Sequence, residues 1–142
     1  MLRTTLLIFC LCISLCAACS RQDDAQLAPD APAGHVPDLA GAYIVNGIDP
    51  LGSEYSGHLT ITEGEMAGSY HMQWIITGSI QEGTATLEGN QLNVEWHSLA
   101  DSAAGEVSGL STYTITVNGE LYGTRTITGH PGEGTETAFP NQ

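Results

Sequence analysis

Short runs of alternating apolar and polar residues fill residues 38–142, and they constrain the fold more than any other feature of the sequence. Gly, Asn and Asp interrupt these runs about every ten residues, and no window carries the apolar spacing of an amphipathic helix. A period of two places successive side chains on opposite faces of a strand. We therefore predict an all-β domain of about eight antiparallel strands that follow one another as an up-and-down meander.

The predicted strands are the alternating runs between the turn residues. They are Gly41–Asn46, Gly57–Thr62, Ser69–Thr77, Gly83–Leu87, Gln91–Trp96, Ser111–Val117, Glu120–Thr128 and Gly134–Phe139. Asn118-Gly119 is a type I′ hairpin signal, and Gly89-Asn90 is expected to form a similar turn. The polar segment Ser98–Ser108 is the one long loop, with the length to move or to bind.

Two stretches of the predicted domain resemble each other. Residues 76–86 (ITGSIQEGTAT) and 127–137 (ITGHPGEGTET) share seven of eleven positions at an offset of 51 residues. Such a match is typical of a duplicated unit, although two Thr- and Gly-rich stretches can also match by composition. We interpret it as two duplicated four-strand halves, and we expect them to close into one small barrel because closure removes exposed sheet edges.

Alternation also predicts which side chains point into the barrel. The inward residues of two strands are expected to be Tyr70, Met72, Trp74 and Ile76, and Leu92, Val94 and Trp96. Their neighbours His71, Gln73, Asn93, Glu95 and His97 should then face solvent. Tyr70, Trp74 and Trp96 are therefore candidates to line a ligand cavity.

Arg125 is an exceptional residue if its face of the strand points inward. The repeat places it where Trp74 lies in the first half, on the strand face of Leu121 and Ile127. A buried guanidinium needs a carboxylate or several acceptors, because its desolvation alone costs several kcal/mol. Two interpretations stay open: Arg125 is the counter-charge for an anionic ligand, or it pairs with a carboxylate of the domain itself.

The first twenty residues indicate export rather than a fold element. Arg3 precedes a mostly apolar run from Leu6 to Leu15, which is too short for a membrane span of ~20 residues and ends in small residues. All four cysteines lie in this segment, so the rest of the chain is expected to fold without a disulfide. We predict a signal peptide over residues 1–18 and cleavage before Cys19.

The residues Leu15-Cys16-Ala17-Ala18-Cys19 resemble a bacterial lipobox, except that Cys16 stands where the motif usually has Leu. The resemblance implies that Cys19 becomes the first residue of a lipoprotein and carries the lipid that anchors it to the membrane. Because Ser20 follows Cys19, where Asp would imply inner-membrane retention, the resemblance implies the outer membrane. The alternative is an ordinary signal peptide that leaves a free thiol at Cys19.

Composition divides the remaining chain into a tether and a single domain. Residues 19–37 are rich in Ala, Pro and Asp and show no structural period, so we predict a flexible tether before the domain at residues 38–142. The formal net charge is −13 and the chain contains no Lys. We therefore expect no nucleic-acid partner and no electrostatic attraction to anionic lipid headgroups.

A pattern of aromatic and glycine residues spans the predicted domain. It includes Gly41-x-Tyr43, Tyr55-Ser56-Gly57-x-Leu59-x-Ile61, Tyr70-x-x-x-Trp74, Leu92-x-Val94-x-Trp96, Leu121-x-Gly123 and Gly134-Thr135-Glu136. This pattern resembles a group of small exported bacterial β domains loosely described as fibronectin-binding-like, although Arg125 stands where that group commonly has an aromatic residue. The eight-strand meander is also similar in architecture to the avidin and lipocalin barrels, which bind small ligands.

No catalytic motif points to an enzyme. The sequence contains no nucleophile elbow, H-E-x-x-H, phosphate-binding loop or dinucleotide turn, and its five histidines lack ligand spacing. We expect no catalysis, cofactor or metal, and instead a monomeric, membrane-anchored binding module that contacts a protein or envelope component through its outer face and loops. Two alternatives stay open: a carrier of a small hydrophobic or anionic ligand at Tyr70, Trp74, Trp96 and Arg125, and a purely structural envelope lipoprotein.

Lipid attachment at Cys19 can be tested by metabolic labelling with a clickable palmitate in the native cell. The unchanged chain should take up the label, and the Cys19→Ala variant should lose it because the only proposed acceptor thiol is gone. In-gel fluorescence of the purified protein measures the label. A Cys19→Ala variant that keeps it would refute the assignment.

Overall fold

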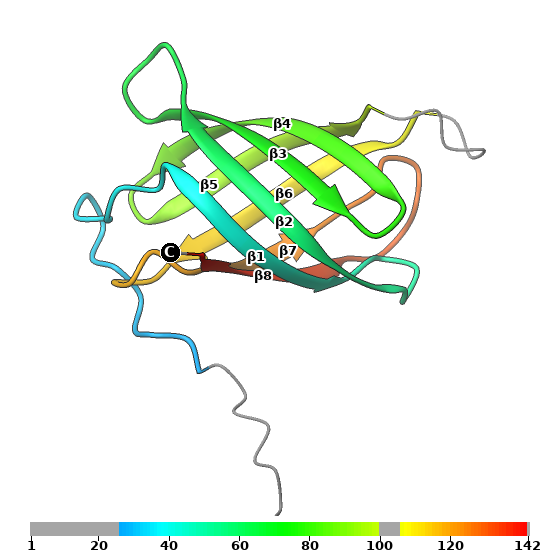
Figure 1. The fold of residues 1–142 in the computed structure, drawn as a ribbon, viewed down its shortest axis with the longest axis horizontal. Helices are drawn as coiled ribbons and strands as arrows, with labels where there is room; N and C mark the ends of the chain where they lie inside the picture. Colours follow the sequence, from blue (N-terminus) through cyan, green and yellow to red (C-terminus); the bar gives the residue numbers. More distant parts are fainter. Residues whose placement is uncertain (1–25, 100–105, 142) are drawn as a thin grey trace, which may run out of the picture.

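A computed structural model of the chain describes residues 26–99 and 106–141, so the predicted signal peptide and Cys19 lie outside the described residues. Eight antiparallel strands, in chain order, close into one barrel (Figure 1). The strands are β1 (Gly41–Ile48), β2 (Glu54–Glu63), β3 (Ser69–Ile76), β4 (Ser79–Glu88), β5 (Gln91–Ser98), β6 (Ser108–Ile115), β7 (Leu121–Arg125) and β8 (Gly134–Pro140). Each strand pairs with its neighbours in sequence and β8 pairs with β1, which confirms the predicted up-and-down barrel.

The two ends of the barrel differ in the connections that they carry, and we call them the closed end and the open end. The closed end carries the β2–β3, β4–β5 and β6–β7 turns, and the open end carries the four other connections (Figure 1). At the closed end, Gly119 has a φ of +80° whereas Asn118 does not have a positive φ. The prediction of a type I′ turn is therefore wrong, because that turn requires positive φ at both residues.

The two stretches that match in sequence occupy equivalent places in the barrel. Residues 76–86 cover the β3–β4 connection and most of β4, and residues 127–137 cover the β7–β8 connection and the first part of β8. The first stretch begins at the last residue of β3 and the second begins two residues after β7, so each follows the third strand of a four-strand half and runs into the fourth. This placement agrees with the interpretation of the halves as equivalent units.

Side-chain burial follows the alternation expected from the sequence. Met72, Trp74, Leu92, Val94 and Trp96 are each at most 4% exposed, whereas the intervening side chains are exposed or half-buried. Apolar residues fill the interior from the closed end to the middle of the strands. They are Tyr43, Val45, Leu59, Ile61, Met72, Ala85, Leu92, Val94, Ile115, Leu121 and Ala138.

Residues 26–37 lie against the closed end of the barrel. The Ala31 amide donates to the Ile115 carbonyl at 2.8 Å, and the Asn90 side-chain amide donates to the Ala31 carbonyl at 2.9 Å. Ala31 and the following Leu39 are 2% and 0% exposed. The expectation of a free tether is therefore wrong for these residues, because their backbone groups and small side chains find partners in the β4–β5 turn and at the end of β6.

Other expectations concern residues that the structure does not describe. The predicted loop Ser98–Ser108 is described only at its ends, where the Ser98 amide donates to the Val107 carbonyl at 2.7 Å; residues 100–105 lie outside the described part. Within the described ranges, no helix has the length and apolar character to cross a membrane.

Truncation of Leu39 tests whether the chain just before β1 packs into the core. Leu39→Ala should lower the free energy of unfolding by about 2–5 kcal/mol, because Leu39 is fully buried. Leu51→Ala is the matched control: Leu51 is 64% exposed, and its loss should cost less than about 0.5 kcal/mol. Urea unfolding, monitored by circular dichroism, gives the free energy of unfolding of both variants. Equal effects would show that Leu39 does not pack as described.

Candidate functional site

The open end of the barrel contains a cavity of about 440 Å³, which we call the cup. Its walls combine apolar side chains with polar ones. Its lining includes Tyr55, Ile76, Ser79, Gln81, Trp96, Ser98, Val107, Arg125 and Ile127. Asp49 and Glu54 lie at its rim, on the β1–β2 connection and the start of β2. A cavity of this size and mixed character is suited to a small molecule.

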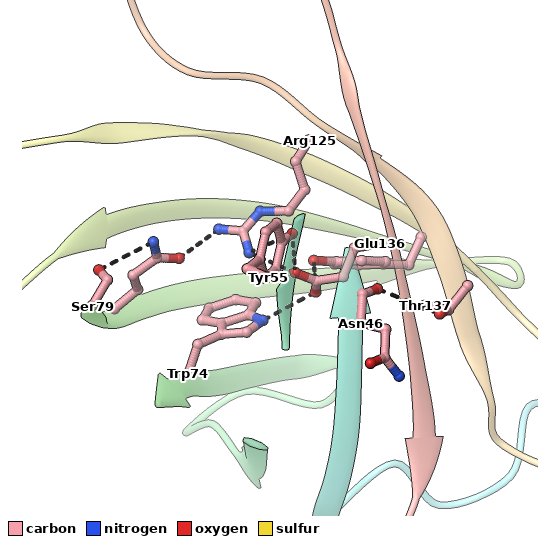
Figure 2. Close-up of polar contacts among 9 residues, drawn as sticks. Asn46, Tyr55, Trp74, Ser79, Arg125, Glu136 and Thr137 are labelled. Atoms are coloured by element: carbon pink, nitrogen blue, oxygen red, sulfur yellow. Dashed lines mark hydrogen bonds and ion pairs between the residues drawn. The ribbon is translucent and has the colours of Figure 1, made fainter. Parts of the chain in front are cut away.

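Below the cup, Glu136 is a carboxylate that is 1% exposed and fully hydrogen-bonded. One carboxylate oxygen, Oε1, accepts from the Tyr113 hydroxyl at 2.6 Å and from Trp74 Nε1 at 3.1 Å. The other, Oε2, accepts from the Tyr55 hydroxyl and from Arg125 Nη1, both at 2.6 Å. Figure 2 shows Tyr55, Trp74 and Arg125 converging on Glu136. Four donors from four strands thus replace the water that the carboxylate loses on burial.

Arg125, at the bottom of the cup, is 4% exposed and has partners on several strands. It forms an ion pair with Glu136 at 2.6 Å, and its Nη2 donates to Gln81 Oε1 at 2.7 Å. The guanidinium carbon lies 4.4 Å from the centre of the Trp96 ring and 5.1 Å from that of Trp74, within the range of cation–π attraction. Of the two interpretations left open by the sequence, the pairing with a carboxylate of the domain is the one observed.

Glycines on the inward faces of β7 and β8 make room for this ion pair. In the β7–β8 register, Arg125 lies opposite Gly134, and Glu136 lies opposite Gly123. The two long side chains therefore face each other diagonally without a competing side chain directly across from either one. A Cβ at Gly123 or Gly134 would also overlap backbone atoms of the neighbouring strand.

The ion pair and burial change the titration of the surrounding groups. Burial and the Glu136 carboxylate raise the pKa of Tyr55 and of Tyr113 well above the ordinary value of 10. Burial alone would lower the pKa of Arg125, but the attraction of Glu136, together with smaller contributions from Tyr113 and Tyr55, outweighs it and the pKa is raised. Arg125 therefore stays charged, and the two tyrosines stay neutral donors, over the physiological pH range.

The structure brings together three of the four predicted cavity residues. Trp96 and Arg125 line the cup, and Trp74 lies beneath it, fully buried, with its indole nitrogen on Glu136. Tyr70 is half-buried near the closed end of β3, six residues before Ile76 of the cup lining, so it lies roughly 20 Å away along the strand.

Sequence reasoning missed the partners that organise the site. They are Tyr55, Gln81, Tyr113 and Glu136. Glu136 carried a usable signal, because alternation in β8 places it on the same face as the small residues Gly134 and Ala138. An acidic residue at an inward position, in a barrel with an inward Arg125, could have been recognised as its partner.

A larger hollow, of about 750 Å³, lies on the outer face over β2–β6. Much of its lining consists of exposed polar side chains, such as His71, Gln73, Glu95 and His97. In the described part of the chain, no three His, Cys, Asp or Glu side chains are grouped so that they could hold a metal ion. The cup is the stronger candidate site, because it combines enclosure with buried polar groups.

No protein-family model matches the sequence, and comparison with curated proteins gives no match. Among solved structures, the chain is similar to designed barrels. A redesigned beta barrel superposes with a TM-score of 0.59 at 14% identity, covering 73% of this chain and 92% of that chain. The redesigned barrel mFAP1, bound to DFHBI, gives a TM-score of 0.57 at 14% identity, covering 72% and 94%. A de novo fluorescence-activating beta barrel gives 0.53 at 11% identity, covering 72% and 93%. At these identities the likeness establishes the small β-barrel fold.

Removing one partner of the buried ion pair should destabilise the barrel strongly. Glu136→Gln leaves the Arg125 charge without its carboxylate, so the free energy of unfolding should fall by about 3–5 kcal/mol. Glu133→Gln, at an exposed position of the β7–β8 connection, should change it by less than about 0.5 kcal/mol. Chemical denaturation measures the free energy of unfolding of each variant.

A double variant tests whether the loss of stability in Glu136→Gln comes from the unpaired charge of Arg125. Arg125→Met combined with Glu136→Gln removes both charges, and it should be more stable than Glu136→Gln alone because no unpaired charge remains buried. A Glu136→Gln variant within about 1 kcal/mol of the unchanged protein would contradict the assignment of a buried ion pair.

Proposed function

We propose that this barrel is a non-catalytic binding module that holds a small molecule in the cup. The observation that carries this proposal is a cavity of about 440 Å³ at the bottom of which lie Arg125 and Trp96, both at least nine-tenths buried. Side chains fill the rest of the interior, so the cup is the part of the barrel interior with room for a ligand. Its apolar walls, with a few fixed polar groups, match the usual composition of a ligand site.

The rigidity of the cup supports this proposal. Seven of the eight strands contribute to its lining or to the hydrogen-bonded residues beneath it, and the side-chain bonds of Glu136 and Arg125 join different strands. A preformed site loses little conformational entropy when a ligand binds. The similar barrel mFAP1 is a designed protein that was solved bound to DFHBI, so a barrel of this size can hold a small molecule.

Membrane anchoring through Cys19 remains part of the proposal. Ala28 meets the barrel at its closed end, nine residues after Cys19, where its amide donates to Glu120. Nine extended residues span at most about 32 Å. A lipid on Cys19 would therefore hold the closed end near the membrane and leave the cup on the opposite side, accessible from the aqueous space.

A second candidate is the binding of a protein or envelope component by the outer face. It is favoured by exposed apolar side chains beside the open end: Ile75 and Ile80 lie opposite each other in β3 and β4, and the Leu99 amide bonds to the Ile80 carbonyl. These three side chains are 56%, 41% and 49% exposed. Such a patch can serve a partner, and it would become the first candidate if the cup bound nothing.

Filling the cup tests the leading proposal. A panel of small aromatic compounds should include one that changes the tryptophan fluorescence saturably, because Trp96 lines the cup. Ile127→Phe enlarges a side chain of the cup, so it should lower the affinity for that compound by about tenfold or more. Ile75→Phe, on the exposed face of β3, should leave the affinity unchanged. Equal affinities in the two variants, or no saturable response to any compound, would contradict binding in the cup.

A further inference from the structure

We propose that the cup selects an uncharged, flat molecule that presents a hydrogen-bond acceptor to Trp96 and Arg125, and that it excludes anions. This inference rests on the proposed function and names the class of ligand for the same cavity. It follows from the charge of the cup, from the donors at its bottom and from the shape of its walls.

The charge of the cup disfavours an anion. Arg125 is the only cation of the cup lining, and its charge is already offset by Glu136 at 2.6 Å. Asp49 and Glu54 place two further carboxylates at the rim, on a chain whose formal net charge is −13. An anion that entered would lose its hydration and would meet a site whose sum of charges is negative.

Donors at the bottom of the cup favour an acceptor group. Trp96 is 4% exposed, and its Nε1 is buried without a hydrogen-bond acceptor among the described residues. A guanidinium has five N–H donors, and the bonds of Arg125 to described residues involve only Nη1 and Nη2. Since buried donors without acceptors cost free energy, a carbonyl or a similar neutral oxygen in the cup would gain these bonds.

The walls of the cup favour a flat body. The Trp96 ring lies over the Arg125 guanidinium at 4.4 Å, and the Tyr55 ring lies 5.8 Å from the same group on another strand. Ile76 and Ile127 add apolar side chains above these groups. An aromatic molecule can therefore contact rings and aliphatic groups with its faces while its polar end reaches the bottom of the cup.

Three fluorescent probes separate these features in the full chain. N-phenylnaphthylamine is uncharged, anilinonaphthalene sulfonate adds a negative charge to the same frame, and the naphthyl ketone prodan is uncharged with a carbonyl acceptor. Fluorescence titration gives the Kd of each. We expect the sulfonate to bind at least about tenfold more weakly than N-phenylnaphthylamine, and prodan to bind most tightly of the three.

Two variants test the charge and the donor separately. Trp96→Phe keeps an aromatic ring but removes the N–H, so it should lower the affinity for prodan about fivefold to tenfold more than the affinity for N-phenylnaphthylamine. Glu54→Gln removes a rim charge without changing the bottom of the cup, so it should raise the affinity for the sulfonate several-fold relative to the affinities for the uncharged probes. Because Glu54 is exposed, this variant stays informative even if Trp96→Phe fails to fold.

The outcomes distinguish this inference from the proposed function. In one outcome, Ile127→Phe lowers the affinity for all three probes, but the sulfonate binds as tightly as N-phenylnaphthylamine. The cup then binds ligands, and the selection against anions is refuted. If Trp96→Phe lowers the affinities for prodan and N-phenylnaphthylamine equally, the preference for a hydrogen-bond acceptor is refuted, because only the aromatic ring of Trp96 then contributes to binding. If no probe binds in a manner sensitive to Ile127→Phe, the proposed function and this inference both fail.

Discussion

The interaction on which the structure depends is the burial of the Glu136 carboxylate against Arg125. Neither charge would be tolerated alone at 1% and 4% exposure, so the two must be brought together by the register of β7 and β8. The remaining carboxylate lone pairs then require Tyr55, Trp74 and Tyr113, which lie on three other strands. One buried carboxylate thereby constrains the relative position of five strands of the barrel.

The cluster also divides the interior of the barrel into two parts. Toward the closed end the interior is packed with apolar side chains, and the segment that contains Ala31 and Leu39 covers that end. Toward the open end, the same cluster forms the bottom of the cup and leaves Arg125 and Trp96 facing it. Packing and the proposed binding site are thus separated along one axis: the apolar half provides stability, and the polar layer forms the fixed, electrically balanced bottom of the cup.

Much of the fold could be predicted from the sequence, because alternation and turn residues are local signals. The strand count and the meander order follow from alternation and turn residues, and the inward positions of Trp74 and Trp96 follow from alternation. For Arg125, the internal repeat supplied the comparison with Trp74. Alternation marks Glu136 as an inward acidic residue, but it assigns a face and not a contact across the barrel. Only the register shows that Glu136 lies diagonally from Arg125.

The N-terminal segment shows a second limit of prediction. Residues 26–37 have the composition of a linker, yet they bond to the β4–β5 turn and to the end of β6. Composition describes what a segment does in isolation, whereas docking depends on unpaired backbone groups that only the folded barrel presents. The same reasoning applies to Gln81, a polar residue that is buried because Arg125 provides its partner.

Spectrophotometric titration of the tyrosines tests the central cluster most directly. Burial, followed by the charge of Glu136, to which both hydroxyls donate, raises the pKa values of Tyr55 and Tyr113 above 10. The contribution of these groups to stability is complete below pH 10 and is lost as the pH rises through the folded-state values. Burial, followed by Asp38 and Tyr70, raises the pKa of Tyr43 to about 12 as well. The account predicts that the phenolate absorbance of these residues appears only above pH 10 and together with unfolding, followed by near-ultraviolet circular dichroism. Ionisation of all the tyrosines near pH 10 in an intact barrel would contradict it.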